Sequence, residues 1–135
     1  MHTWLYTLFE KTMTQEDKNL LLIDLCARLP YGVKCKDQYG DYINVNIYNA
    51  HIEHLIDQIL SGVVQMVLRP MSSMTEEEKT EYRNIALGIE WNYGIQFPTT
   101  NKMDWLNAHH FDYRGLIEKN LALEAPEGMY NIKEK

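Results

Sequence analysis

The chain has 135 residues, of which 45% are hydrophobic and 24% are charged. This length is typical of one domain, and the composition is that of a globular protein, which excludes general disorder. The formal net charge is −6, and the 13 Lys and Arg residues are scattered along the chain. An acidic surface repels nucleic-acid phosphates and anionic lipid, so nucleic acid is a disfavoured partner and no membrane partner is expected.

The two cysteines, Cys26 and Cys35, are too few for a disulfide framework. The N-terminal residues do not resemble a secretion signal, and no apolar run approaches the length of a membrane span, so we expect a cytoplasmic protein. We expect Cys26 to fill a core position on a helix. Lys34 and Lys36 would favour a thiolate at Cys35 if it were exposed, but alternation along a strand favours its burial.

A central helix is predicted to begin at Thr14, because Asp17 follows three residues later as in a capping box. Its apolar residues extend over more than one side, so we expect this helix to be the buried element of the fold. They are Leu20, Leu21, Leu22, Ile23, Leu25, Cys26 and Leu29. Pro30 and Gly32 are expected to end the helix, and Thr3 is expected to cap a shorter helix before it.

Residues 33–37 and 41–48 are predicted to form a β-hairpin, with Gly40 in the connecting loop. The second strand alternates with a period of two, which is the clearest strand pattern in the chain. One side carries Ile43, Val45 and Ile47, and the other carries Tyr42, Asn44, Asn46 and Tyr48. Because a lone hairpin is marginally stable, helices must cover it.

Two more helices are predicted after the hairpin. Residues 52–60 have apolar side chains at helical spacing and polar side chains on the opposite face. The apolar segment 63–68 fits either a short strand or a helical turn. Thr75 and Glu78 then form a second capping box, which begins a helix with Tyr82, Ile85, Ala86 and Ile89 on its apolar face.

The last third of the chain predicts a helix over residues 101–110 and a second short helix over 112–119. The apolar segment 121–123 is expected to dock in an extended conformation. We therefore expect an α+β fold, with helices packed on a β-hairpin or small antiparallel sheet. Residues 1–125 are predicted to form a single globular domain, and residues 126–135 a frayed C-terminal tail.

Three blocks of the sequence resemble small proteins encoded by gut anaerobic bacteria and their phages or prophages. The blocks are LRPMSSMTEEE at residues 68–78, DWLNAHHFDYRGLI at 104–117 and LCARLPYGV at 25–33. The resemblance implies a bacterial or phage cytosol and a mobile-element neighbourhood. It implies no activity, cofactor or catalytic residue.

Two groups of ionisable residues could bind a divalent transition metal. The first group, spaced three apart on the polar face of the 52–60 helix, is His51, His54 and Asp57. The second, after the helix that begins near residue 101, is His109, His110 and Asp112. For both groups we favour a structural interpretation, namely a solvated face for the first, and core hydrogen bonding and helix capping for the second. No cofactor is therefore predicted.

Aromatic residues could form a partner-binding surface, because Tyr and Trp bury a large area at low entropic cost. The candidates are Tyr42, Tyr48, Trp91 and Tyr93. The favoured alternative is that these side chains simply cover the sheet.

The sequence has no Gly-rich phosphate loop, nucleophile elbow or His-Glu zinc motif, so it indicates no particular enzyme activity. We favour a non-enzymatic protein-binding or accessory protein of a phage or mobile element, with an unknown protein partner. A metal-binding protein or metal-dependent enzyme is the first alternative. The second is a nucleic-acid-binding regulator in which residues 112–123 act as part of a helix-turn-helix, against which the acidic charge argues.

Overall fold

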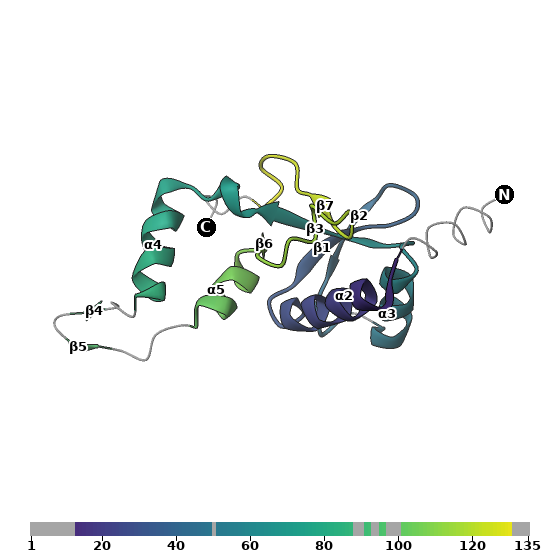
Figure 1. Ribbon diagram of the computed structural model, residues 1–135, viewed down its shortest axis with the longest axis horizontal. Coiled ribbons are helices and arrows are strands. Elements are labelled where there is room, and N and C mark those ends of the chain that lie inside the picture. Colours follow the sequence, from purple (N-terminus) through teal and green to yellow (C-terminus); the bar gives the residue numbers. More distant parts are fainter. Residues whose placement is uncertain (1–12, 50, 88–90, 93–94, 97–100, 131–135) are drawn as a thin grey trace.

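The structure is a computed structural model that describes residues 13–49, 51–87, 91–92, 95–96 and 101–130. The described elements form an elongated molecule with two parts (Figure 1). One part is a small sheet with α2 and α3 on one face, and the other consists of α4 and α5 beyond one end of the sheet. The predicted α+β class is confirmed. The short helix expected after Thr3 lies outside the described residues.

Helix α2 (Gln15–Arg28) begins at the predicted capping box. The Thr14 hydroxyl accepts the backbone N–H of Asp17, and the Asp17 carboxylate accepts the backbone N–H of Thr14. These two bonds satisfy N–H groups that a helix start otherwise leaves without partners. At the other end Gly32 adopts a left-handed φ of +84°, which lets the chain turn back into the sheet.

The buried side of α2 differs from the prediction. Ile23 and Cys26 are exposed, whereas Asp24 and Arg28 are fully buried beside the leucines of the core. Because α-helical residues four apart lie on one side, Asp24 and Arg28 share the face that packs on the sheet. The prediction that Cys26 fills a core position is therefore wrong, and so is the wide apolar stripe that included Ile23.

Strands β1 (Val33–Lys36) and β2 (Tyr42–Val45) form the predicted hairpin, with shorter strands than expected. Cys35 is buried as predicted, and burial raises the pKa of its thiol to about 12. The alternation in the second strand is confirmed only at Val45. Ile43 in β2 and Ile47 beyond its end are exposed, and among the described strands β2 is an edge strand that pairs only with β1.

Strand β3 (Gln65–Pro70) lies in the middle of the sheet and pairs antiparallel with β1. Residues 65–68 of the ambiguous segment 63–68 therefore belong to a strand, and residues 63–64 precede it. Two short strands, β6 (Phe111–Asp112) and β7 (Leu123–Glu124), pair with β3 in parallel. The sheet is consequently mixed, which corrects the expectation of a small antiparallel sheet.

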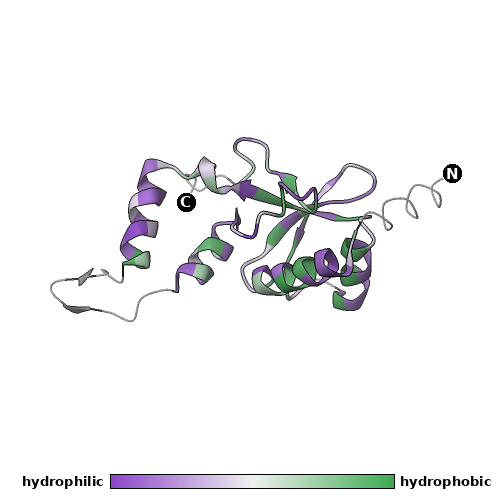
Figure 2. Ribbon diagram, viewed as in Figure 1, coloured by the Kyte–Doolittle hydropathy of each residue, from purple (hydrophilic) through white to green (hydrophobic). Residues whose placement is uncertain are grey.

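Helix α3 (Ile52–Leu60) packs beside α2 on one face of this sheet. Figure 2 shows green, hydrophobic residues concentrated in α2, α3 and β3, whereas the outer helix α4 is mostly purple. The main core is aliphatic, and its largest fully buried apolar members are Leu21, Leu25, Val64, Met66, Leu68 and Leu116.

Helices α4 (Glu76–Ala86) and α5 (Lys102–Ala108) form the second part, together with a 3₁₀ turn at Met71–Ser73 and the short pair β4 (Trp91–Asn92) and β5 (Ile95–Gln96). The Thr75–Glu78 capping box is confirmed at the start of α4. Asn101 caps α5, as expected from the sequence. This part has its own small core, made of Ile85, Trp105, Leu106 and Phe111.

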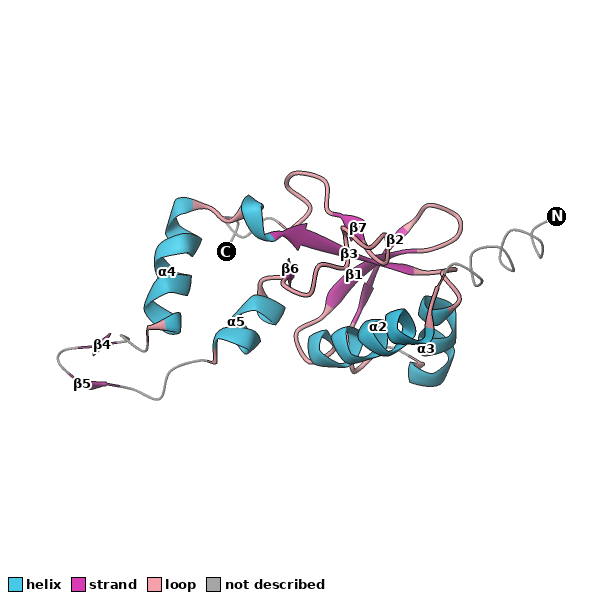
Figure 3. Cartoon of the chain, in the orientation of Figure 1, coloured by secondary structure: helices cyan, strands magenta, loops and turns pink. Residues whose placement is uncertain are grey.

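The predicted helix over residues 112–119 is wrong, because Asp112 ends β6 and residues 113–119 form an irregular loop followed by turns (Figure 3). Asp112 uses both carboxylate oxygens to accept the backbone N–H groups of Leu116 and Ile117. The carboxylate thus provides the hydrogen bonds that these two N–H groups would otherwise make within a helix. Gly115 also adopts a positive φ, which α-helical residues do not have. Segment 112–123 therefore lacks the helices that a helix-turn-helix requires.

Candidate functional site

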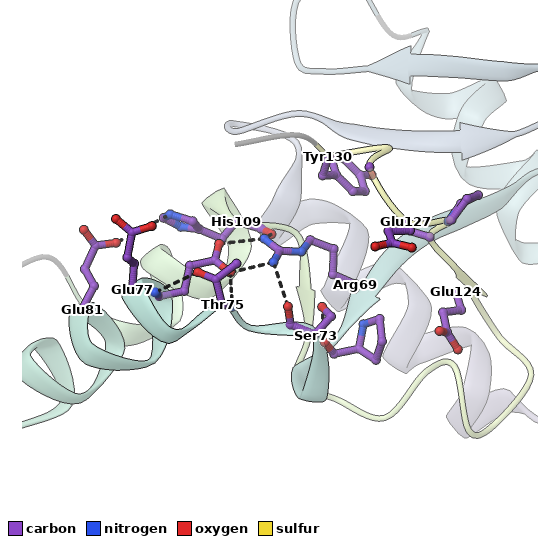
Figure 4. Close-up of a pocket in the computed structure, with 14 residues that line it drawn as sticks. Arg69, Ser73, Thr75, Glu77, Glu81, His109, Glu124, Glu127 and Tyr130 are labelled. Atoms are coloured by element: carbon purple, nitrogen blue, oxygen red, sulfur yellow. Dashed lines mark hydrogen bonds and ion pairs between the residues drawn. The ribbon is translucent and has the colours of Figure 1, made fainter. Parts of the chain in front are cut away.

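A cleft of about 880 Å³ lies between the end of β3, the start of α4, the end of α5 and the C-terminal residues 124–130. This volume falls within the usual range of ligand sites, about 300–1,000 Å³. Figure 4 shows side chains from all four segments around it, with Arg69 near the middle. The junction between the two parts of the molecule is thus hollowed rather than filled.

The floor of the cleft is a buried ion pair between Arg69 of β3 and Glu78 of α4. The guanidinium donates two hydrogen bonds to the Glu78 carboxylate, of 2.7 and 2.9 Å. It also donates to the backbone carbonyls of Ser73 and His109 and lies 4.0 Å from the centre of the Phe111 ring. Arg69 therefore joins three segments and is already neutralised within the structure.

Glu78 has a second task as the N3 residue of the α4 capping box. Its carboxylate accepts the Thr75 backbone N–H at 2.9 Å in addition to the Arg69 guanidinium. Burial alone would raise the pKa of Glu78, but hydrogen bonds from Arg69 and Thr75 outweigh it and lower the pKa below its ordinary value. The carboxylate is therefore ionised at neutral pH and holds Arg69 in place.

His109 lies at one wall of the cleft, at the end of α5. Its ring stacks on Trp105 with centroids 4.0 Å apart, and its Nδ1 lies 2.9 Å from the Trp105 carbonyl. A carbonyl only accepts, so Nδ1 carries the proton and Nε2 is left to face Glu81, whose carboxylate is 3.8 Å away. Glu81 in turn accepts the indole N–H of Trp105 at 2.7 Å. These contacts orient both side chains.

Four glutamates at the cleft have exposed side chains and give it a negative charge. Glu77 and Glu81 project from α4, and Glu124 and Glu127 lie on the opposite side of Arg69 (Figure 4). Within the described part of the chain, none of the four forms an ion pair with a Lys or Arg. Since Glu78 balances Arg69, the cleft carries an excess of carboxylates.

The structure separates the histidines that the sequence offered as metal ligands. His51, the N-cap of α3, and His54 in α3 are exposed, whereas His109 is the C-cap of α5 in the other part of the molecule. His110 is not among the residues that line the cleft, and its ring stacks on Tyr130. Asp112 is occupied by backbone N–H groups. Among the residues that the structure describes, no group of three or more His, Cys, Asp or Glu side chains is placed to hold a metal ion.

The aromatic partner-binding candidates divide into two pairs. Tyr42 is 48% exposed and Tyr48 is 92% exposed, so both lie at the surface instead of covering the sheet. Tyr42 also packs under the Lys36 ammonium at 5.5 Å. The side chain of Trp91 and all of Tyr93 lie outside the described residues.

Most cleft residues were missed in the sequence, because they come from distant segments and form no motif. His109 was singled out, and Glu78 was recognised only as a helix cap. Arg69 had a possible signal, since an arginine inside an otherwise apolar strand needs a partner. Tyr130 also had a signal in the sequence, because it is an isolated aromatic residue in a polar tail.

The hydroxyl groups at the cleft are engaged in local structure. Ser73 donates to the Pro70 carbonyl at 2.7 Å, and Thr75 accepts the Glu78 backbone N–H at 3.1 Å. Neither hydroxyl is hydrogen-bonded to His109, the side chain that could serve as a general base. Both hydroxyl groups are thus bonded to nearby backbone groups.

No protein family, curated protein or solved structure matches the chain. Across the described ranges, no helix combines the length and the apolar character needed to span a bilayer.

Proposed function

We propose that this protein is a non-enzymatic binding protein that holds a cationic segment of another protein in the acidic cleft. The observation that carries the proposal is the set of four exposed glutamates around a cleft whose own arginine is already paired. Opposite charges across an interface speed encounter and select the partner. Lysine and arginine side chains are the groups that such a lining attracts.

The apolar part of the lining supports a protein segment as the ligand. Pro70, Ala125 and Pro126 lie among the carboxylates of the cleft. Lys and Arg place an aliphatic stem on apolar surface while their charged ends remain near water and carboxylates. A nucleic acid would instead bring phosphates against the glutamates, which disfavours that alternative.

The exposed Tyr42 and Tyr48 support the same class of function by offering a second contact surface on the sheet part. The proposal of a phage or mobile-element accessory protein, acting in the cytoplasm, depends on the sequence resemblance. Two of the three resembling blocks supply cleft residues, including Arg69 and Glu78 from one and His109 from the other.

The test is binding of a fluorescent oligolysine peptide, measured by anisotropy at low and physiological salt. We expect the triple variant Glu77→Gln, Glu124→Gln, Glu127→Gln to weaken binding about tenfold, because each exposed charge contributes up to about 1 kcal/mol. These side chains are exposed, so the variant is expected to fold normally.

The matched control changes three exposed glutamates elsewhere, with the variant Glu16→Gln, Glu53→Gln, Glu118→Gln. It removes the same net charge from α2, α3 and a turn. We expect it to change the affinity less than twofold at physiological salt, where distant charges are screened. Equal loss of affinity in both triple variants, or no binding by the wild-type protein, would contradict the proposal.

A further inference from the structure

One wall of the acidic cleft is the last described segment of the chain, residues 124–130, which we call the C-terminal strap. It contributes Glu124 and Glu127 to the cleft, together with Pro126, Gly128 and Tyr130. The strap follows β7 and was expected to be frayed from residue 126 onward. In the structure, the Tyr130 hydroxyl is hydrogen-bonded to backbone groups of β1 and β3.

The strap is attached to the rest of the molecule at its two ends. At the first end, the Ala125 backbone N–H donates to the Leu68 carbonyl at 2.8 Å. Between the ends, the Met129 N–H donates to the Pro126 carbonyl at 3.1 Å and closes a turn. Gly128 allows that turn with a φ of +86°. Glu127 is exposed at its tip.

The second attachment is the Tyr130 hydroxyl. It accepts the Lys34 backbone N–H at 2.7 Å and donates to the Val67 carbonyl at 2.7 Å. Lys34 and Val67 face each other in the register of β1 and β3, so the hydroxyl bridges two paired strands. The ring stacks on His110, with centroids 3.9 Å apart and an angle of 17° between the planes.

We propose that Tyr130 is a positioning residue that latches the C-terminal strap onto the sheet and so fixes the carboxylate-bearing wall of the binding cleft. Its one hydroxyl is hydrogen-bonded to two backbone groups on neighbouring strands, so a single side chain holds the end of the strap on the sheet. The attachment of the strap follows from the hydrogen bonds and the ring stack of Tyr130. Its effect on affinity rests on the proposed function.

The latch affects binding through pre-organisation. Holding Glu124 and Glu127 in place before a ligand arrives removes the entropic cost of ordering them during binding. Without the latch, the strap remains tied at Ala125 but its distal half is free to leave the cleft. A cationic segment would then have to order this wall itself.

The test compares Tyr130→Phe with wild type, because the phenyl ring keeps the stack on His110 and removes only the hydroxyl. Amide hydrogen exchange is followed residue by residue by NMR. We expect exchange at Lys34 and Met129 to accelerate about fivefold, since a hydrogen bond contributes about 1 kcal/mol. Exchange at Leu29, whose N–H donates to Leu25 in α2, is expected to stay within twofold.

Oligolysine binding supplies the second measurement. We expect Tyr130→Phe to weaken the affinity about threefold or more, while Tyr39→Phe at an exposed tyrosine leaves it unchanged. Unchanged exchange at Lys34 and Met129, or equal acceleration at Leu29, would overturn the latch. Faster exchange with unaltered affinity would overturn its role at the cleft. If wild type does not bind oligolysine, the proposed function fails while the exchange data still decide the latch.

Discussion

The two parts of the molecule are stabilised in different ways. The sheet, α2 and α3 enclose a continuous aliphatic core, whereas α4 and α5 enclose only a small one centred on Trp105. The second part is also held by polar contacts, among them the Arg69–Glu78 pair and the hydrogen bond from Trp105 to Glu81. The cleft therefore lies at the edge of the aliphatic core, where charged side chains replace buried apolar ones.

Among the described residues, two ion pairs are buried in different settings: Arg69–Glu78 joins β3 of the sheet part to α4, whereas Arg28–Asp24 lies within α2. In α2, Arg28 donates to Asp24 at 2.6 Å, and both side chains have no solvent exposure. Arg114 adds a second cation to Asp24 at 3.0 Å, and Arg28 reaches the Phe111 carbonyl at 2.7 Å. This pair connects α2 with the β6 region, so it ties the large core to the second part.

The largest expected effect comes from breaking the pair inside the large core. Asp24→Asn leaves the buried Arg28 without a counter-charge, which costs about 3–5 kcal/mol of the free energy of unfolding. We expect urea unfolding, followed by circular dichroism, to shift as a single transition. The control Glu76→Gln, at an exposed pair with Lys79, should change the free energy by less than about 1 kcal/mol. If Asp24→Asn changed the free energy of unfolding as little as the control does, the buried Asp24–Arg28 pair would not stabilise the large core.

Acidification is expected to have the next largest effect, through His110. Burial is the main cause that lowers the pKa of His110 from 6.5 to about 4, and the facing cations Arg28, His109, Arg69 and Lys34 add to it. A histidine whose pKa is lower in the folded state contributes its full stability above pH 6.5 and loses it as the pH falls toward 4. Between pH 8 and 5 we expect a loss of about 2 kcal/mol.

The variant His110→Asn isolates this effect, because Asn accepts the left-handed φ of 68° and does not titrate. Urea midpoints at pH 8 and pH 5 should differ less in this variant than in wild type. His54→Asn, at an exposed histidine on α3, should retain the wild-type difference. If His110→Asn also retains it, another group causes the acid sensitivity.

The smallest expected effects come from removing the capping hydroxyl at the start of α2 or of α4. Thr14→Ala and Thr75→Ala each remove a hydroxyl that accepts an N–H at a helix start, worth about 1 kcal/mol. We expect Thr14→Ala to lower the free energy of global unfolding by this full amount, because α2 belongs to the large core. Thr75→Ala should instead accelerate amide exchange mainly within α4. Equal global destabilisation by both variants would show that the two parts unfold as one unit.

Local patterns in the sequence determined several elements of the fold. The Thr14 and Thr75 capping boxes marked two helix starts, because their hydrogen bonds join residues three apart. The Gly40 loop indicated the hairpin, and the apolar spacing of residues 52–60 indicated α3. All of these depend on contacts within a few residues.

Only the tertiary structure decided which polar groups are buried and where the cleft lies. No pattern within α2 marked Asp24 and Arg28 as buried, and Arg28 donates to the carbonyl of Phe111, which is distant along the chain. Residues 113–119 do not form a helix, because the Asp112 carboxylate accepts backbone N–H groups of this segment. The cleft joins Arg69, Glu78 and Tyr130, which are separated by up to 61 residues along the chain. Such contacts depend on long-range packing, and no local sequence pattern specifies them.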